Sequence, residues 1–157
     1  LHFESVAEVA TPKGTLVDYQ LQDIERVSQS LKTLKRLING NSQYAATAVT
    51  GSNVITKVIQ VDARLSENEL ENQVQLEAEQ IIPFPLDEVS LDFEILSLAS
   101  DQDRQEVLLS AARTESVNGR VSALAEAGMT TKVVDVGAHA LGRAVLACQP
   151  EQDRTVA

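Results

Sequence analysis

Residues 66–95, SENELENQVQLEAEQIIPFPLDEVSLDFEI, decide the fold, because they predict an acidic helix, a proline elbow and a strand in direct succession. Ser66 and Glu69 have the spacing of a capping box, in which each side chain binds the backbone amide of the other residue. The helix is therefore expected to begin at Ser66. Its apolar positions recur at helical spacing and form one buried stripe of Leu70, Val74, Ala78 and Ile81.

Pro83 ends this helix, because the residue before a proline is driven out of the helical region of the backbone. Beyond Leu86 the apolar residues alternate with polar ones, a period of two that predicts a strand over 89–98 with one buried face. The polar stretch 100–105 predicts an exposed hairpin loop, after which strand 106–112 pairs antiparallel with strand 89–98.

The rest of the chain alternates further strands and helices. We expect strands over 2–11, 44–49, 54–61 and 131–136, and helices over 21–38, from Thr114 to a stop at Gly128, and over 137–148. The turn-rich tetrad 50–53 predicts a hairpin between strands 44–49 and 54–61. Strand 54–61 is apolar on both faces, so we expect it near the centre of its sheet. The last helix is expected to carry Ala140, Leu141, Ala144, Val145 and Cys148 on one side.

Composition limits the fold class and the kinds of partner. The chain has 157 residues, 43% of them hydrophobic but only 3% aromatic, which predicts a core of aliphatic side chains in an α+β or α/β fold. With 23 acidic and 13 basic residues the net charge is −10, which opposes nucleic-acid binding. The basic cluster of Lys32, Lys35 and Arg36 is typical of a solvated helix face.

The candidate chemical groups are few. Cys148 has no partner for a disulfide, which favours a reducing compartment, and its apolar surroundings predict a buried side chain. His2 and His139 lack the further ligands that a zinc site needs. Asp135 precedes a helix start and is typical of a cap. The acidic group of Glu77, Glu79, Asp87, Glu88 and Asp92 is typical of a solvated surface rather than of acid–base catalysis or magnesium binding.

No phosphate-binding loop, nucleophile elbow, signal peptide or apolar run long enough to span a membrane is present in the sequence. We therefore expect a protein that is not an enzyme and does not insert into the membrane.

Four segments in order resemble the type IV pilus assembly protein PilM family, actin-like proteins of the bacterial cytoplasm. They are VTGSNVITKVIQVD (49–62), EAEQIIPFPLDEVSLDF (77–93), EVLLSAARTESVNGRV (106–121) and TTKVVDVGAHALGRA (130–144). The resemblance extends from about Ala7 to Leu146. The Gly-Ile-Asp-Ile-Gly phosphate loop and the second lobe of the family are missing, so we expect a piece covering less than half of a longer protein.

This resemblance implies an α+β fold: a partial actin-like first lobe, α/β-like, that carries an inserted strand-helix-strand-strand-helix subdomain. We place the insertion at 63–132, the remnant of the lobe at 1–62 and 133–149, and a disordered tail at 150–157. An incomplete lobe leaves a sheet edge open, and such edges pair readily with other copies. A homodimer, domain-swapped or edge-paired, is therefore one possible assembly.

The resemblance also implies a function in pilus biogenesis and twitching motility, at the inner face of the inner membrane. Family members hold the cytoplasmic N-terminal peptide of the inner-membrane protein PilN in a groove between the lobe and the insertion. The residues expected to line such a groove are Val58, Ile82, Phe84, Leu86 and Val89. Phe84, fixed in direction between two prolines, either meets the peptide or packs into the interior beneath the elbow.

A second hypothesis is that the chain is part of an actin-like ATP-binding protein. Such a protein would be an ATPase, or a component related to FtsA or to type II secretion. The intact family binds ATP with magnesium, but without the phosphate loop we expect no cofactor here. The elbow segment EAEQIIPFPLDEV resembles PilM more closely than FtsA.

Overall fold

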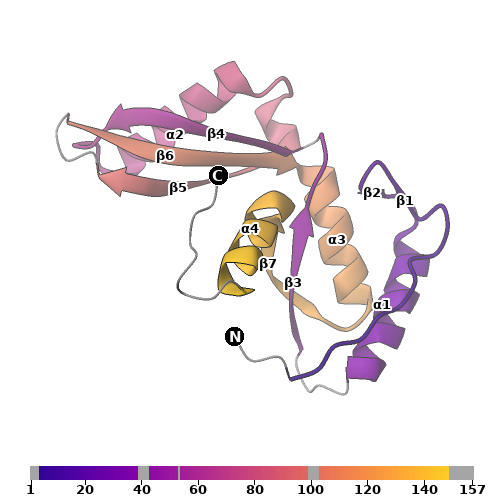
Figure 1. Ribbon diagram of the computed structural model, residues 1–157. Helices are drawn as coiled ribbons and strands as arrows, with labels where there is room; N and C mark the ends of the chain where they lie inside the picture. The colour runs from indigo at the N-terminus through magenta and orange to yellow at the C-terminus, as the bar shows by residue number, and fades with distance from the viewer. Residues whose placement is uncertain (1–3, 39–42, 53, 99–102, 149–157) are drawn as a thin grey trace. The chain divides into compact units, whose positions relative to one another are not determined.

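The computed structural model describes residues 4–38, 43–52, 54–98 and 103–148 (Figure 1), and the chain divides into two compact units. Ser52–Val117 forms one of them, which we call the central unit because it lies in the middle of the sequence. The described residues on either side of it form the other, the flanking unit.

The central unit is a three-stranded antiparallel sheet with one helix packed on it. Strands β4 (Val54–Asp62), β5 (Val89–Leu98) and β6 (Arg104–Arg113) take the order β4-β6-β5. Helix α2 (Glu67–Ile81) connects β4 to a 3₁₀ turn, η1 (Leu86–Glu88), which leads into β5. The sheet and the helix share one core.

Alternation along β6 fixes which face of the sheet is buried. Gln105, Val107, Leu109 and Ala111 are buried and the residues between them are half-buried, so every second side chain faces the helix. The apolar stripe predicted for α2 supplies the other half of this core. Its buried residues, with those of the strands, are Ile59, Val61, Leu70, Val74, Ala78, Ile82, Val107, Leu109 and Ala111.

The start of α2 confirms the predicted cap. The Glu69 carboxylate accepts hydrogen bonds from the Ser66 backbone amide at 2.9 Å and from the Ser66 hydroxyl at 2.6 Å. These bonds lower the pKa of Glu69, because both favour its charged form. The cap thus joins the end of β4 to the helix in a defined direction.

The flanking unit is built on two parallel strands. Strand β3 (Tyr44–Val49) pairs with β7 (Thr130–Val136), and three helices accompany them: α1 (Ile24–Ile38), α3 (Thr114–Glu126), which begins in the last residues of the central unit, and α4 (Gly137–Cys148). A small hairpin of β1 (Leu16–Val17) and β2 (Gln20–Leu21) precedes α1.

Charged side chains tie these elements to one another. Arg120 on α3 donates to the Ala48 carbonyl at 2.8 Å and to the Tyr19 carbonyl at 2.6 Å, and partial burial lowers its pKa. Lys35 on α1 donates to the carbonyl of Gly128 at 2.6 Å. Gly128 has φ +73 and follows α3, as predicted for its stop.

Three sequence-based expectations about the strands are wrong. The described residues 4–11 form no strand, because no described strand pairs with them. Strands β3 and β4 form no hairpin, because β3 pairs with β7 in one sheet and β4 pairs with β6 in another. Strand β4 is also an edge strand, and β6 takes the central place.

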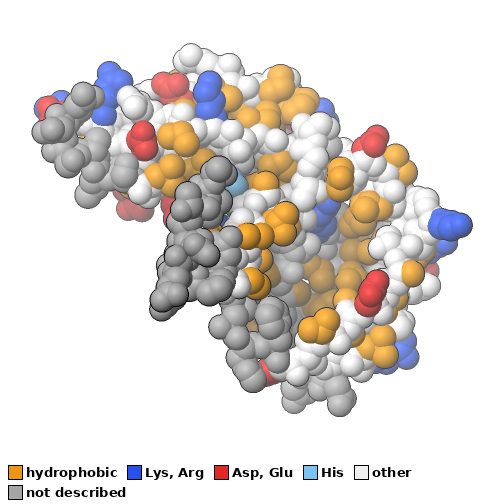
Figure 2. Space-filling model, in the orientation of Figure 1, with side chains coloured by type: hydrophobic (Ala, Val, Ile, Leu, Met, Phe, Trp, Pro, Cys, Tyr) orange, Lys and Arg blue, Asp and Glu red, His pale blue; other side chains and the backbone are white. Residues whose placement is uncertain are grey.

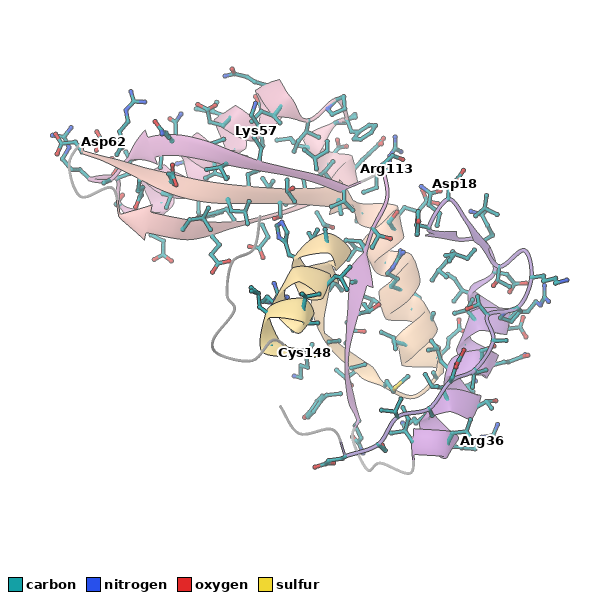
Figure 3. All side chains as sticks on the ribbon, viewed as in Figure 1. Asp18, Arg36, Lys57, Asp62, Arg113 and Cys148 are labelled. Carbon is teal, nitrogen blue, oxygen red and sulfur yellow. The ribbon has the colours of Figure 1, made fainter. Side chains whose placement is uncertain are left out.

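The burial expected for Cys148, on the last helix, is wrong too. Leu141 is 66% exposed, Val145 is 46% exposed and α4 contains no buried residue. Figure 2 shows hydrophobic side chains at the surface in the area of α4. Cys148, at the end of this helix (Figure 3), is exposed rather than buried. Periodicity identifies the apolar side of a helix, but it does not say whether anything covers that side.

The compact units divide the chain after Gly51 and after Val117, whereas the sequence placed the insertion at 63–132. Strand β4 therefore lies with α2 and not with the flanking strands. The assignment of these parts to actin-like lobes stays a prediction, and the expected tail at 150–157 falls outside the described residues.

Gly137 gives a test of the flanking unit. A Cβ at this position would overlap the Thr50 methyl carbon and lie 3.4 Å from the Val49 carbonyl oxygen. We predict that Gly137→Ala lowers the free energy of unfolding by about 1–3 kcal/mol through overpacking. Urea denaturation measures the loss.

The same helix offers the control. Nothing lies within 4 Å of a Cβ at Gly142, so Gly142→Ala is expected to stabilise the protein by up to about 1 kcal/mol. Thr50→Ser, which removes the overlapping methyl group, is expected to recover part of the loss in the Gly137→Ala background. Equal changes in the free energy of unfolding for Gly137→Ala and Gly142→Ala would contradict the close contact of Gly137 with Thr50 and Val49.

Candidate peptide-binding site

The elbow between α2 and β5 is held by backbone hydrogen bonds as well as by its prolines. Ile82 leaves the helix with φ −89 and ψ 121, while its amide still donates to the Ala78 carbonyl at 2.8 Å. Pro85, with φ −55 and ψ 133, opens the 3₁₀ turn, and the Glu88 amide donates to its carbonyl at 3.0 Å. The direction of the elbow is thus set by local geometry.

Phe84, at the middle of the elbow, is half-buried and packs against the core beneath α2. The Arg113 guanidinium lies over its ring, 4.1 Å from the centroid. Arg113 is the last residue of β6 and pairs with Val89 at the start of β5. This cation–π contact therefore connects the elbow to the end of the sheet.

The five predicted lining residues do not form one surface. Ile82 is only 6% exposed and belongs to the core, and Phe84, Leu86 and Val89 pack against the same core. Val58 is 47% exposed and alternates with the buried Ile59, so it lies on the face of the sheet opposite α2. The structure thus brings four of the residues together and separates Val58 from them; their role in peptide binding stays a prediction.

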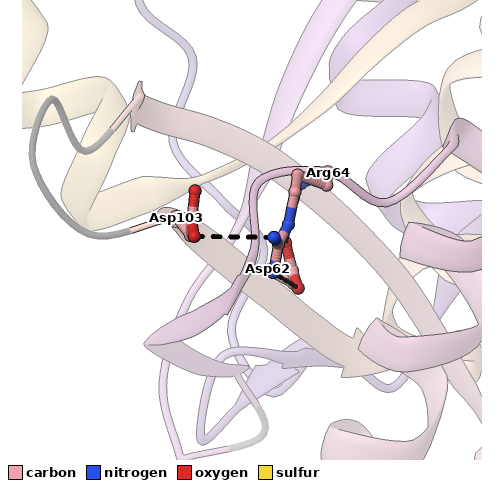
Figure 4. Close-up of polar contacts among 3 residues, drawn as sticks. All are labelled: Asp62, Arg64 and Asp103. Carbon is pink, nitrogen blue, oxygen red and sulfur yellow. Dashed lines mark hydrogen bonds and ion pairs between the residues drawn. The ribbon is translucent and has the colours of Figure 1, made fainter.

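A cavity of about 550 Å³ opens at the end of the sheet where β4 leads into α2. It is lined by Gln60, Val61, Asp62, Arg64, Leu65, Gln73, Glu77, Asp103 and Arg104. Arg64 binds Asp62 through two nitrogens, at 3.1 and 3.0 Å, and lies 3.5 Å from Asp103 (Figure 4). Its charges largely pair with one another, so this cavity offers a ligand few unpaired groups.

The other candidate residues have structural surroundings. Asp135 accepts from the Val136 amide at 2.7 Å and pairs with Arg143 of α4, so it contacts the start and the side of this helix. His139 is half-buried on α4, and His2 is outside the described residues. In the part of the chain that the structure describes, no three His, Cys, Asp or Glu residues gather to hold a metal ion.

The acidic candidates of α2, η1 and β5 are exposed, except for Glu77, which is half-buried and accepts from Gln73 at 3.1 Å. In the basic cluster, Lys35 binds the end of α3, a role that the sequence did not reveal. Its partner Gly128 is 93 positions away along the chain. The role of Arg120 was also not predicted, because its partners Ala48 and Tyr19 are far from it along the chain.

Comparison with known proteins agrees with this architecture. The chain matches the type IV pilus assembly protein PilM family over residues 1–155. The chain belongs to the type IV pilus assembly protein PilM family. A solved structure, the "PilM-PilN type IV pilus biogenesis complex", is similar to it with a TM-score of 0.81 and 34% sequence identity.

The match covers 90% of this chain and 42% of the chain in the solved structure. This chain therefore spans less than half the length of that relative. The mixed helices and strands, together with this likeness, confirm the predicted α+β fold and its relation to part of the actin-like PilM structure. Within the described ranges, no helix is both long and apolar enough to cross a bilayer.

Phe84 provides a test of the elbow. If it is chiefly a core residue, as its packing indicates, Phe84→Ala is expected to lower the free energy of unfolding by about 2 kcal/mol. Arg113→Gln, which removes only the cation over the ring, is expected to cost about 0.5–1 kcal/mol. A change below about 0.5 kcal/mol for Phe84→Ala in urea denaturation would instead indicate a surface residue.

Asp62 provides a pH test. Its two-point hydrogen bond with Arg64 lowers the pKa of its carboxyl from 3.8 to about 2. The stabilisation that this ion pair gives the folded protein is thus fully present above the ordinary carboxyl pKa of 3.8. It is lost as the pH falls through the lowered pKa of about 2. Carboxyl-carbon NMR should show this midpoint, and Arg64→Gln should raise it toward 3.8. An unchanged midpoint in Arg64→Gln would contradict the assigned cause.

Proposed function

We propose that this chain is the peptide-binding part of a type IV pilus biogenesis protein. Its central unit binds the cytoplasmic N-terminal peptide of a PilN-like inner-membrane protein and so helps to assemble the inner-membrane platform. It acts on the cytoplasmic side of that membrane. The observation that carries this proposal is the likeness to the PilM–PilN complex, at 34% identity over 90% of the chain.

Two features of the central unit support binding of an extended peptide. Strands β4 and β5 are both at the edge of the three-stranded sheet, where backbone groups are available for an added strand. Val58, on edge strand β4, is exposed beside Leu108 of β6, and these aliphatic side chains offer contacts to a bound segment. We therefore place the peptide on Val58 rather than on the buried Ile82.

Calorimetry of the chain against a synthetic N-terminal peptide of the PilN-like protein tests this function. We expect saturable binding, weakened about fivefold by Val58→Ser, because about a methylene group or two of apolar contact is lost. The matched control is Leu76→Ser, which changes a 55% exposed side chain on α2 and should leave the affinity unchanged. Absence of binding by the unmutated chain would contradict the proposal.

We further propose that the chain works by binding and not by ATP hydrolysis. Gly51, the glycine of the segment VTGSNV, is followed by a strand rather than a helix, and its Cβ position lies 3.0 Å from the Tyr19 ring. A phosphate loop instead opens onto a helix N-terminus. Titration with a fluorescent ATP analogue and magnesium is expected to give no saturable signal. Saturation at micromolar concentration would contradict this.

A further inference from the structure

The whole net charge of the protein resides in the central unit. Of the 23 acidic and 13 basic residues, Ser52–Val117 holds 14 and 4, and the rest of the chain holds nine of each. The rest of the chain is therefore neutral and the segment Ser52–Val117 carries a net charge of −10. A partner that approaches the central unit meets a field of one sign, which favours a cationic partner over an anionic one.

The strand register places part of this charge on the face of the sheet opposite α2. On β5, Asp92 and Glu94 alternate with Leu91 and Phe93, which pack against the core. On β6, Glu106 alternates with buried residues of the helix-facing side. Asp92, Glu94 and Glu106 thus lie on this second face, which we call the open face because no described element of the central unit covers it.

The centre of the open face is aliphatic. Val58 on β4 pairs with Leu108 on β6, and Leu108 pairs in turn with Glu94 on β5. One row across the sheet therefore runs from an exposed valine through a half-buried leucine to an exposed carboxylate. Asp92 lies in the next row, opposite Ser110.

Only one basic side chain of the described strands, Arg104, lies on the open face. Arg113 covers the Phe84 ring, and Lys57 alternates with Val58, so both belong to the side of α2. Arg64 is paired with Asp62 and Asp103. Arg104, at the end of β6, lies opposite Asp62 and shares the open face with Glu106. Asp92 and Glu94 thus have no cation from these strands beside them in the rows from Val54 to Gln60, whereas Glu106 has Arg104 two positions away on the same face.

The kind of partner that fits this face follows from charge and from the proposed function, on which this inference rests. Cytoplasmic segments next to a membrane span carry an excess of Lys and Arg. We propose that the open face docks a basic segment of the PilN-like cytoplasmic peptide, with aliphatic side chains on Val58 and Leu108 and with Lys or Arg beside Asp92, Glu94 and Glu106.

The test compares two triple variants of the full chain by calorimetry against the same synthetic PilN-like peptide. Asp92→Asn/Glu94→Gln/Glu106→Gln neutralises the open face and keeps the size of each side chain. Glu67→Gln/Glu71→Gln/Glu79→Gln makes the same change of net charge on the exposed side of α2. Circular dichroism verifies that both variants fold.

We expect the open-face variant to bind the peptide about tenfold more weakly at low salt. Each exposed ion pair changes the affinity by about two- to threefold, and the variant removes three carboxylates. The α2 variant should lose less than about twofold, and a difference in salt dependence should separate the two. A peptide with its Lys and Arg replaced by Gln should bind the unmutated chain and the open-face variant equally.

Equal weakening in both triple variants would overturn the inference, because it would show only diffuse attraction to a net charge. An unchanged affinity in the open-face variant would also overturn it, while leaving the proposed function standing. Absence of binding by the unmutated chain would refute the proposed function itself and this inference with it.

Discussion

The packing of α2 on the helix-facing side of β6 is the interaction on which the central unit depends. Val74 and Ala78 meet Val107 and Leu109 in a core that is closed to solvent. Such burial contributes about 25 cal/mol for each Å² of apolar surface removed from water, so this layer dominates the stability of a small unit. Within the central unit, this helix covers one face of the sheet and no described element covers the other.

The local parts of this unit could be predicted from sequence. The cap at Ser66 and Glu69, the stripe of α2 and the end of the helix before Pro83 depend on residues within a few positions of one another. The hairpin of β5 and β6 is equally local, since its strands are adjacent in the sequence. The structure confirms all of them.

Strand order and side-chain exposure could not be predicted in the same way. Whether β4 is central or at an edge depends on which strand pairs with it, and β6 lies more than 40 residues further along the chain. Val58 was predicted to share one surface with Phe84, but the two lie on opposite sides of the sheet. Alternation along a strand defines two faces but does not show which element covers each face. The bonds of Lys35 and Arg120 link distant segments and leave no local pattern.

The proposed function depends on three properties of the central unit: a sheet backed by one helix, edge strands with the exposed Val58, and a strongly acidic charge. A binding surface that is already folded loses less entropy when a partner binds, and a charge of one sign favours encounter with a segment of the opposite sign. The elbow at Phe84 connects α2 to β5, and the Phe84 ring packs against the core and under Arg113.

Methyl NMR of the chain during titration with the PilN-like peptide tests this central claim most directly, because it reports on both faces of the sheet at once. The account predicts that the methyl signals of Val58 and Leu108 shift while those of Val74 and Ile82 stay in place. Shifts confined to Val74 and Ile82 would contradict it and would place the peptide against the helix side of the sheet.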